Sequence, residues 1–211
     1  MNKIVLRLSL LALCFAMAMP FAKAQVHVGD ILCDDDEVVS CSGLETLGRT
    51  PVGVVFYVDA TGKHGWAVAL NELGDCAWGP NSKDTPLRNY TAKQQATTDL
   101  NGYSNTKTIQ EGGYDIPFPA FDSLNMEKGW YLPAIGQLKR LFDNLNKVNE
   151  SLSAVNGLPI PSEVDCEYWS STEYSVCNAW FIDSFGELHY SDQTYNGDKD
   201  GRRRIRGVKN F

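Results

Sequence analysis

Apolar and polar residues follow two different periods along this chain, and each period predicts a different kind of element. After Pro133, apolar residues recur every three to four positions with charged and amide residues between them, which is typical of an amphipathic helix. Its apolar positions are Ile135, Leu138, Leu141, Phe142, Leu145 and Val148. We expect one long helix here, buried along this stripe against a sheet. A second, shorter helix is predicted over 92–100, capped by Thr91 and stopped by Asn101-Gly102.

Short runs of apolar, β-branched and aromatic residues predict strands. Residues 52–58 and 66–70 are separated by a polar segment that contains Gly, and together they predict a hairpin. Further strands are predicted over 168–172, 178–183, 188–190 and 203–209. In several of these strands apolar and polar residues alternate, as they do in a sheet with one face in water.

The segments between these elements are expected to be irregular. Residues 25–50 are rich in Gly and acidic residues, which favour turns, and 74–91 is loop-like. Pro117 and Pro119 oppose regular structure around them. The 187 residues that follow residue 24 suit one domain with a full core. We therefore expect a single α+β domain over 51–211, preceded by an irregular segment.

The first 24 residues have the composition of an export signal. A basic start precedes an apolar run over 8–19, and Ala22-Lys23-Ala24 supplies the small residues that a signal peptidase needs. The run is too short to span a bilayer, and no later segment is apolar enough to do so. We expect the mature chain to start at Gln25 and to be secreted, periplasmic or displayed on the cell surface. Cys14 raises the alternative of a lipoprotein, although the residue before it is not small.

Cleavage after residue 24 makes the chain strongly acidic. Lys3, Arg7 and Lys23 are three of its 19 basic side chains, so 16 remain against 26 acidic ones, a net charge of −10. A chain with that balance is a poor general ligand for nucleic acid or for an anionic membrane surface. The acidic run from Asp34 to Glu37 offers carboxylates to a cation, but a solvated turn is the simpler explanation.

Five cysteines remain after cleavage, and export allows them to form disulfides. Cys166 and Cys177 flank a predicted strand and are close enough in sequence to join its ends, while Cys33 and Cys41 enclose the acidic turn. We predict these two pairs, which leave Cys76 unpaired. A bond from Cys33 or Cys41 to Cys76 is the alternative. No CxxC is present and the histidines show no ligand spacing, so no metal site is predicted.

Five motifs in the second half of the chain follow one another in a fixed order. They are Trp130-x-Leu132-Pro133, Gln137-Leu138-x-x-Leu141, Tyr168-Trp169-Ser170-Ser171-Thr172-Glu173, Asn178-Ala179-Trp180 and Ile205-Arg206-x-Val208-Lys209. Over roughly residues 50–211 this order resembles the domain that closes Legionella collagen-like adhesins and the related Fibrobacter major paralogous domain. Both are similar to the wider C-type-lectin-like superfamily, which includes formylglycine-generating enzymes. Two earlier segments, Val28-Gly29-Asp30-Ile31-Leu32-Cys33 and Gly53-Val54-Val55-Phe56-Tyr57-Val58, also resemble exported proteins of gut Bacteroidetes that carry this domain.

The resemblance implies a C-type-lectin-like fold, with two helices packed on short antiparallel strands, long loops and termini close together. It also implies a surface adhesion module or the tip of a larger assembly. Some features depart from the family. The collagen-like adhesins bind sulfated polysaccharides, and the negative charge of this chain opposes that ligand. The Glu-Pro-Asn or Gln-Pro-Asp turn of calcium-dependent lectins is absent, and Gly207 stands where many relatives have Cys.

The loop before the last predicted strand carries candidate ligands. Asn196, Asp198 and Asp200 alternate before Gly201, as oxygen ligands do in the first half of a calcium loop. The Glu that should close such a loop is replaced by Gly207. No cofactor is therefore predicted, with calcium left open as an alternative. The other explanation is a polar hairpin loop whose acidic residues are balanced by arginines.

Arg202, Arg204 and Arg206 fall on one face of the last predicted strand. Their guanidinium groups offer planar donor pairs that could hold a sulfate or a carboxylate. The alternative is ion pairing with nearby acids, namely Asp198, Asp200 or Glu187.

Aromatic rings are the second kind of candidate, because they can stack on sugars. Trp130, Trp169 and Trp180 lie within the ordered motifs, so we expect them to pack in the core. Trp78 lies in a loop with Gly, Pro and Asn, and Tyr195 lies in the polar loop before the last strand. We predict that these two rings are exposed and form any glycan platform.

No constellation of residues supports catalysis. A Gly-x-Ser-x-Gly motif is absent, and a Cys76–His64 pair has no local support. We expect an exported, non-enzymatic recognition or adhesion module that binds a glycan or a surface protein through its loops. One alternative is a structural component of a surface assembly with no small ligand. The other is an enzyme related to formylglycine-generating enzymes, although Cys166 and Cys177 are further apart than the redox pair of those enzymes.

Overall fold

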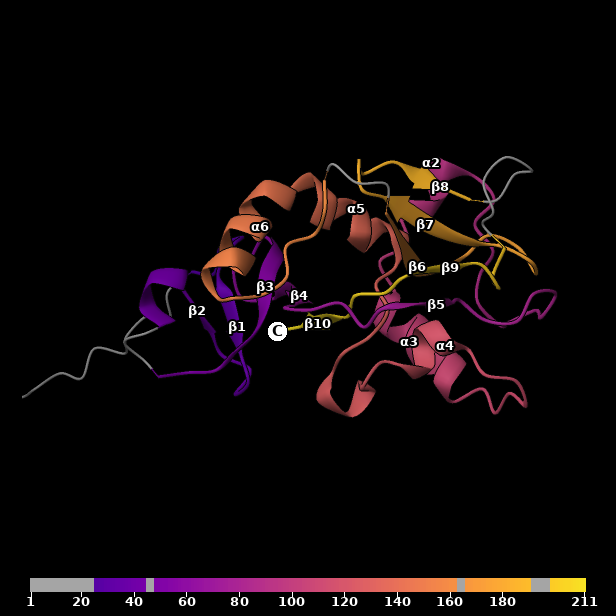
Figure 1. Ribbon diagram of the computed structural model, residues 1–211, viewed down its shortest axis with the longest axis horizontal. Helices are drawn as coiled ribbons and strands as arrows, with labels where there is room; N and C mark the ends of the chain where they lie inside the picture. The colour runs from indigo at the N-terminus through magenta and orange to yellow at the C-terminus, as the bar shows by residue number, and fades with distance from the viewer. Residues whose placement is uncertain (1–24, 45–47, 163–165, 191–197) are drawn as a thin grey trace, which may run out of the picture.

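The computed structural model describes residues 25–44, 48–162, 166–190 and 198–211. The predicted export signal lies outside these residues. The described chain forms two five-stranded sheets with helices packed on them, which confirms the predicted α+β class (Figure 1). None of the described helices is both long enough and apolar enough to cross a membrane.

The first sheet is antiparallel and has the strand order β10-β4-β3-β1-β2. Its strands are β1 (Ile31–Cys33), β2 (Val38–Val39), β3 (Pro51–Val58), β4 (Gly65–Ala69) and β10 (Val208–Asn210). β3 and β4 confirm the predicted hairpin. The prediction that 25–50 is irregular is wrong, because β1 pairs with β3 and β2 pairs with β1. Strands of two or three residues show no period, so only pairing with a neighbour defines them.

The second sheet has the strand order β5-β9-β6-β7-β8, in which only β6 and β9 run parallel. Its strands are β5 (Asp75–Ala77), β6 (Glu167–Glu173), β7 (Ala179–Asp183), β8 (Leu188–His189) and β9 (Arg202–Arg204). The predicted strand over 203–209 is wrong as one element, because the chain leaves the second sheet after β9 and enters the first at β10. Arg206 holds this crossing: its guanidinium donates to the carbonyls of Ala69, Leu70 and Leu158 at 2.9, 2.7 and 2.6 Å.

The predicted long helix is divided into α5 (Ile135–Asp143) and α6 (Leu145–Ala154). Asn144 stands at the break with φ −113° and ψ 15°. Its side-chain amide donates to the carbonyl of Phe56 at 3.3 Å and to that of Arg140 at 3.0 Å. The break is thus tied to β3, while the apolar stripe on both sides of it is buried as predicted.

The remaining helices and 3-10 turns were predicted only in part. They are α2 (Lys93–Ala96), α3 (Gly102–Gln110), α4 (Pro119–Asp122), η1 (Cys41–Gly43) and η2 (Met126–Lys128). The helix expected over 92–100 is a single turn. Gly102 begins α3 instead of stopping a helix. Its lack of a side chain is needed for close packing, since a Cβ there would lie 2.7 Å from the carbonyl oxygen of Leu132. Pro119 is the first residue of α4, where a helix needs no N–H donor.

The core is divided among three clusters by the two sheets. The largest lies between both sheets and α5 and α6, and it contains Trp180. The second lies between the second sheet and α3 and α4, on the opposite side from α5 in Figure 1, and it contains Trp169. Both tryptophans are fully buried, as predicted. A small third cluster contains Val26, and Phe211 packs against the same cluster, so residues near both ends of the described fold contribute to it.

Candidate functional site

Trp78 is fully buried, so the prediction of an exposed ring at this position is wrong. Pairing of β5 with β9 directs the indole into the cluster beneath the second sheet, even though Gly and Pro follow it in sequence. The ring packs edge-on against Phe121 with the centroids 4.8 Å apart, and Nε1 donates to the carbonyl of Ser170 at 2.7 Å. Tyr195, the other predicted ring, lies outside the described residues.

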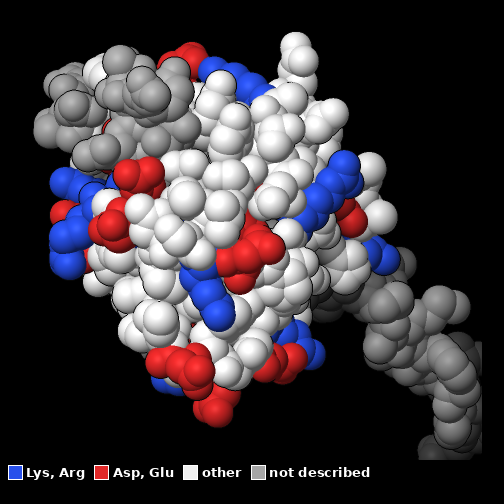
Figure 2. Space-filling model, turned by 90° about the vertical axis from the view of Figure 1, so that its right-hand side faces the viewer, with Lys and Arg blue, Asp and Glu red and all other residues white. Residues whose placement is uncertain are grey.

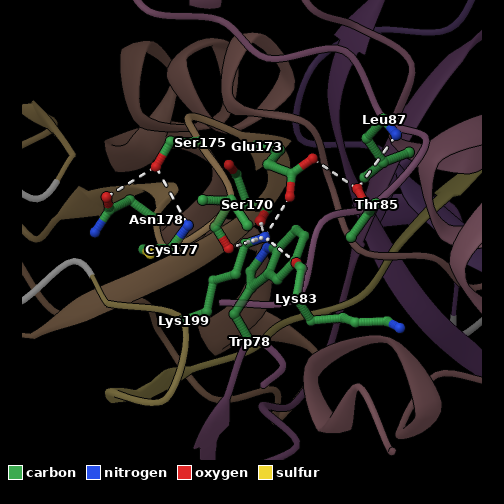
Figure 3. A network of polar contacts seen from close by, with 11 residues as sticks. Trp78, Lys83, Thr85, Leu87, Ser170, Glu173, Ser175, Cys177, Asn178 and Lys199 are labelled. Atoms are coloured by element: carbon green, nitrogen blue, oxygen red, sulfur yellow. Dashed lines mark hydrogen bonds and ion pairs between the residues drawn. The ribbon is translucent and has the colours of Figure 1, made fainter. Parts of the chain in front are cut away.

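A buried ion pair lies beside Trp78, close to the predicted ligand loop (Figure 3). Lys199 contacts Glu173, and neither side chain has exposed surface. Lys199 Nζ also donates to the carbonyls of Lys83 and Val176, both at 3.0 Å, and lies 4.7 Å from the centre of the Trp78 ring. An ammonium has three donors, and all three have acceptors here. This arrangement is complete without a ligand.

Burial acts on both charges of this pair. It raises the pKa of Glu173 and lowers the pKa of Lys199, while the contact between the two groups opposes both shifts. Thr85 donates to the second carboxyl oxygen of Glu173 at 2.6 Å. Together the pair joins the β6–β7 hairpin to the segment before β9 and to the loop after β5. We therefore assign these residues a role in stabilising the fold.

Two of the three arginines proposed to share an anion face lie together, because Arg202 and Arg204 line one polar hollow of about 360 Å³ beside Asp75 and Glu167, whereas Arg206 is not part of that hollow. Arg202 is exposed and donates to the carbonyl of Asp75. Arg204 pairs with Glu72 at 3.3 Å, and Arg206 is buried at the crossing between the sheets. The alternative of ion pairing describes Arg204, although its acidic partner is far away in sequence and was not among those predicted.

Arg203 was not singled out from the sequence, yet it is the most enclosed residue of β9. Its guanidinium carbon lies 4.2 Å from the ring centre of Trp169 and 3.8 Å from that of Phe181, and its Nε lies 2.7 Å from Glu167. Burial lowers the pKa of Arg203, and Glu167 opposes that shift. Arg203 thus packs among aromatic rings under the second sheet.

The described part of the loop considered for calcium does not gather ligands. Asp198 accepts from the amide of Asn178 at 3.0 Å, and Asp200 is exposed. Asn196 lies outside the described residues. Over the part of the chain that the structure describes, no group of three or more His, Cys, Asp or Glu side chains is placed to hold a metal ion.

Neither predicted disulfide is present. Cys166 precedes β6 and Cys177 precedes β7, at opposite ends of the β6–β7 hairpin, because Glu173 pairs with Ala179 beside the turn. The seven residues of β6 separate the two cysteines by roughly 20 Å, whereas the Cα atoms of a disulfide lie about 4–7 Å apart. The β1–β2 hairpin separates Cys33 from Cys41 in the same way.

The structure does not bring a nucleophile and a base together at Cys76. Cys76 lies in β5 of the second sheet, whereas His64 precedes β4 of the first. Burial raises the pKa of the Cys76 thiol to about 11, with Arg202 opposing, which disfavours the thiolate that a nucleophile needs. His189, the histidine of the second sheet, lies 2.8 Å from Asp183.

A groove is built around the half-buried indole of Trp130, beside the first sheet. The six-membered ring packs where two glycines leave room: a Cβ on Gly53 would lie 3.2 Å from Trp130 Cη2, and one on Gly207 would lie 3.5 Å from Cε3. Gly53 pairs with Ala69 in the sheet, and a Cβ on Gly53 would be 2.8 Å from the carbonyl oxygen of Val68. Small residues therefore make the seat for the ring.

The groove has a volume of about 380 Å³. Its lining consists of Pro51, Val52, Ala69, Leu70, Asn71, Leu73, Ser123, Leu124, Asn125, Trp130 and Gly207. None of these side chains carries a charge. Three offer hydrogen bonds, and Leu73 is 54% exposed at the groove. A concave, mostly apolar site with a few polar groups is typical of small-ligand binding.

A second hollow of about 530 Å³ adjoins the first and shares Ser123, Leu124 and Asn125 with it. Gln110, Asp122 and Glu127 also line it, so this part is polar and acidic. The backbone here is fixed by η2, because Asn125 Oδ1 accepts from the N–H of Lys128 at 3.1 Å. In Figure 1 this loop lies below β10.

Another hollow, of about 350 Å³, lies between the β3–β4 turn and the chain end. It is lined by Tyr57, Trp66 and His64 among others. Its rings are already stacked: the centroids of Tyr57 and Trp66 are 4.4 Å apart, and the guanidinium of Arg140 lies 4.5 Å from the Tyr57 ring centre. These contacts occupy the rings within the protein.

Figure 2 shows the end of the molecule that lies on the right of Figure 1. Acidic and basic side chains are interspersed on this face, with uncharged surface between them. This face therefore lacks the single-sign field that would steer a polyanion.

The Trp130 groove was not predicted, because the motif around Trp130 was assigned to the core. The ring is indeed half-buried, and its neighbours in the groove come from three distant segments and from the nearby residues 123–125. A usable signal was the presence of Gly53 in an otherwise bulky β-branched run. Glycine in a strand interior often marks the close approach of another group.

No protein-family model and no curated protein matches the sequence. The fold is similar to that of a fimbrial protein from Bacteroides ovatus, with a TM-score of 0.68 and 18% sequence identity. The likeness covers 88% of this chain and 49% of the fimbrial protein, so this chain spans about half the length of that neighbour.

Proposed function

We propose that the chain is an exported, non-enzymatic recognition module of a fimbria-like surface assembly. The observation that carries the proposal is the fold shared with the fimbrial protein over 88% of the chain. The export signal predicted over residues 1–24 agrees with it. Because the likeness reaches only half of that protein, we propose that this chain supplies one module of the assembly.

Several features of the described residues support a binding role over a catalytic one. Cys76 has a raised pKa and does not face His64, and the buried Lys199–Glu173 pair is fully engaged within the protein. The Trp130 groove is open and carries no ionisable group that could act as an acid or base. We propose that the module works without a cofactor.

The proposal includes kinship with the C-type-lectin-like domains of collagen-like adhesins and of the Fibrobacter paralogues. Three features support it: the ordered motifs, the two helices α5 and α6 packed against β3, and the one small cluster to which both Val26 and Phe211 belong near the ends of the fold. The likeness to a fimbrial protein also agrees with the alternative of a purely structural subunit, and the Trp130 groove is the feature that favours recognition.

Surface display can be tested on intact cells that express the full chain. Antibodies against the protein should label unpermeabilised cells, and mechanical shearing should release the protein together with surface fibres. A variant lacking residues 2–24 is the matched control, and it should stay inside the cell. Retention of the full chain inside intact cells, or release only as a monomer that never enters fibres, would overturn the proposal.

A further inference from the structure

We propose that the Trp130 groove binds a neutral saccharide of one or two rings. This deepens the proposed function by naming a site and a ligand class. The chemistry of the groove stands independently of whether the module enters a fibre. The site differs from the glycan platform expected from the sequence, because Trp78 is buried in the core.

The first support is the fixed position of the ring. Trp130 packs against the first sheet at Gly53 and Gly207, and its backbone N–H donates to the carbonyl of Asn125 at 3.1 Å. Its neighbour Tyr131 is held by a pair of hydrogen bonds with Val208 of β10. An aromatic ring held in this way loses little conformational entropy when a ligand packs on it. The C–H groups of a sugar are a suitable partner for the electron-rich face of an indole.

The second support is the absence of charge. None of the eleven lining residues is acidic or basic, in a mature chain with an expected net charge of −10. An anionic sugar would gain no ion pair in the groove and would be repelled by the protein as a whole. A cationic ligand would favour the adjoining hollow, where Asp122 and Glu127 lie. The groove itself therefore matches an uncharged ligand.

The third support is the hydrogen-bonding capacity of the lining. Asn71 and Asn125 each carry an amide, which both donates and accepts; the hydroxyl of Ser123 donates to the carbonyl of Pro119 at 2.7 Å and can still accept a hydrogen bond. Within the described residues, no hydrogen bond uses the side chain of Asn71, and that of Asn125 uses only Oδ1. Hydroxyl groups of a sugar need such partners when they leave water. An apolar peptide side chain would leave this capacity unused.

The test measures binding of purified mature protein to a glycan array and, by titration calorimetry, to the hits. Neutral probes are lactose, N-acetyllactosamine and mannobiose, and the charged probes are sialyllactose and sulfated lactose. Trp130→Leu keeps an apolar cover over the glycines and removes the aromatic face, while Trp66→Leu is the matched control in another hollow. Asn71→Ala removes an exposed amide of the groove, and Asn89→Ala removes an exposed amide elsewhere.

We expect the protein to bind a neutral probe. W130L should raise the dissociation constant about tenfold, because one aromatic contact is lost. N71A should raise the dissociation constant about threefold to tenfold, because one hydrogen bond is lost. W66L and N89A should leave it unchanged, and circular dichroism should show that all four variants are folded. A preference for charged probes, equal binding by W130L or N71A, or no binding to any neutral probe would overturn the inference. Competition by an apolar peptide instead of a sugar would also overturn it. None of these results depends on surface display, so this failure is separate from a failure of the proposed function.

Discussion

Removing one partner of the buried Lys199–Glu173 pair should strongly destabilise the fold. Lys199→Met leaves a carboxylate with no exposed surface and removes the donor from the carbonyls of Lys83 and Val176. Breaking a buried pair in this way costs about 3–5 kcal/mol. Lys93→Met is the matched control, because its pair with Glu187 is mostly exposed; that change should cost less than about 1 kcal/mol.

The assay is equilibrium unfolding in urea at pH 7, followed by tryptophan fluorescence and by circular dichroism. The double variant Lys199→Met with Glu173→Leu places apolar side chains of similar size at both positions. It should be more stable than Lys199→Met alone, because replacing both charges removes the uncompensated carboxylate. A cost below about 1 kcal/mol for Lys199→Met, or simple additivity of the two single changes, would refute the reasoning.

The same pair predicts a dependence on pH. Burial already raises the pKa of Glu173 in the native protein, and loss of the lysine should raise it further. A raised pKa in the folded state means that the folded protein binds the proton more tightly than the unfolded chain. The stability that this proton contributes is fully present below the ordinary pKa of glutamate, and it is lost as the pH rises through the pKa of Glu173 in the folded protein. The cost of Lys199→Met should therefore be smaller at pH 4.5 than at pH 7.

Three further changes test other parts of the structure. In a variant that retains Cys76 as its one cysteine, the rate of reaction with a disulfide reagent should rise about tenfold for each pH unit up to about 11, and a plateau below pH 9 would contradict the burial of the thiol. Arg206→Lys should lower the free energy of unfolding by about 2–3 kcal/mol, measured in urea, because an ammonium cannot reproduce the planar contacts with three carbonyls. Gly53→Ala should cost about 1–3 kcal/mol in thermal unfolding, because the new Cβ meets the Val68 carbonyl and the Trp130 ring; an unchanged melting temperature would show that the seat of the ring is loose.

The sequence by itself determined those elements whose pattern of apolar residues can be recognised within a short segment. The stripe over residues 135–148 has a helical period, and β3 is an almost unbroken run of apolar and β-branched residues. The burial of both therefore follows from the local sequence. The burial of Trp169 and Trp180 was predicted from the ordered motifs in which they lie, whereas the covering of both faces of β6 and β7 was not, because a sheet with one face in water was expected. Where the period continued through a break, as at Asn144, the prediction gave one helix in place of two.

Only the tertiary structure decided which distant residues meet. Pairing of β5 with β9 buried Trp78, although its neighbours in sequence are typical of a loop. Lys199 meets Glu173 across the second sheet, and Trp130 reaches Gly53 across the first. These contacts depend on strand order and on the room left by small residues. Neither leaves a periodic trace in a single sequence, because both depend on partners that lie many residues away.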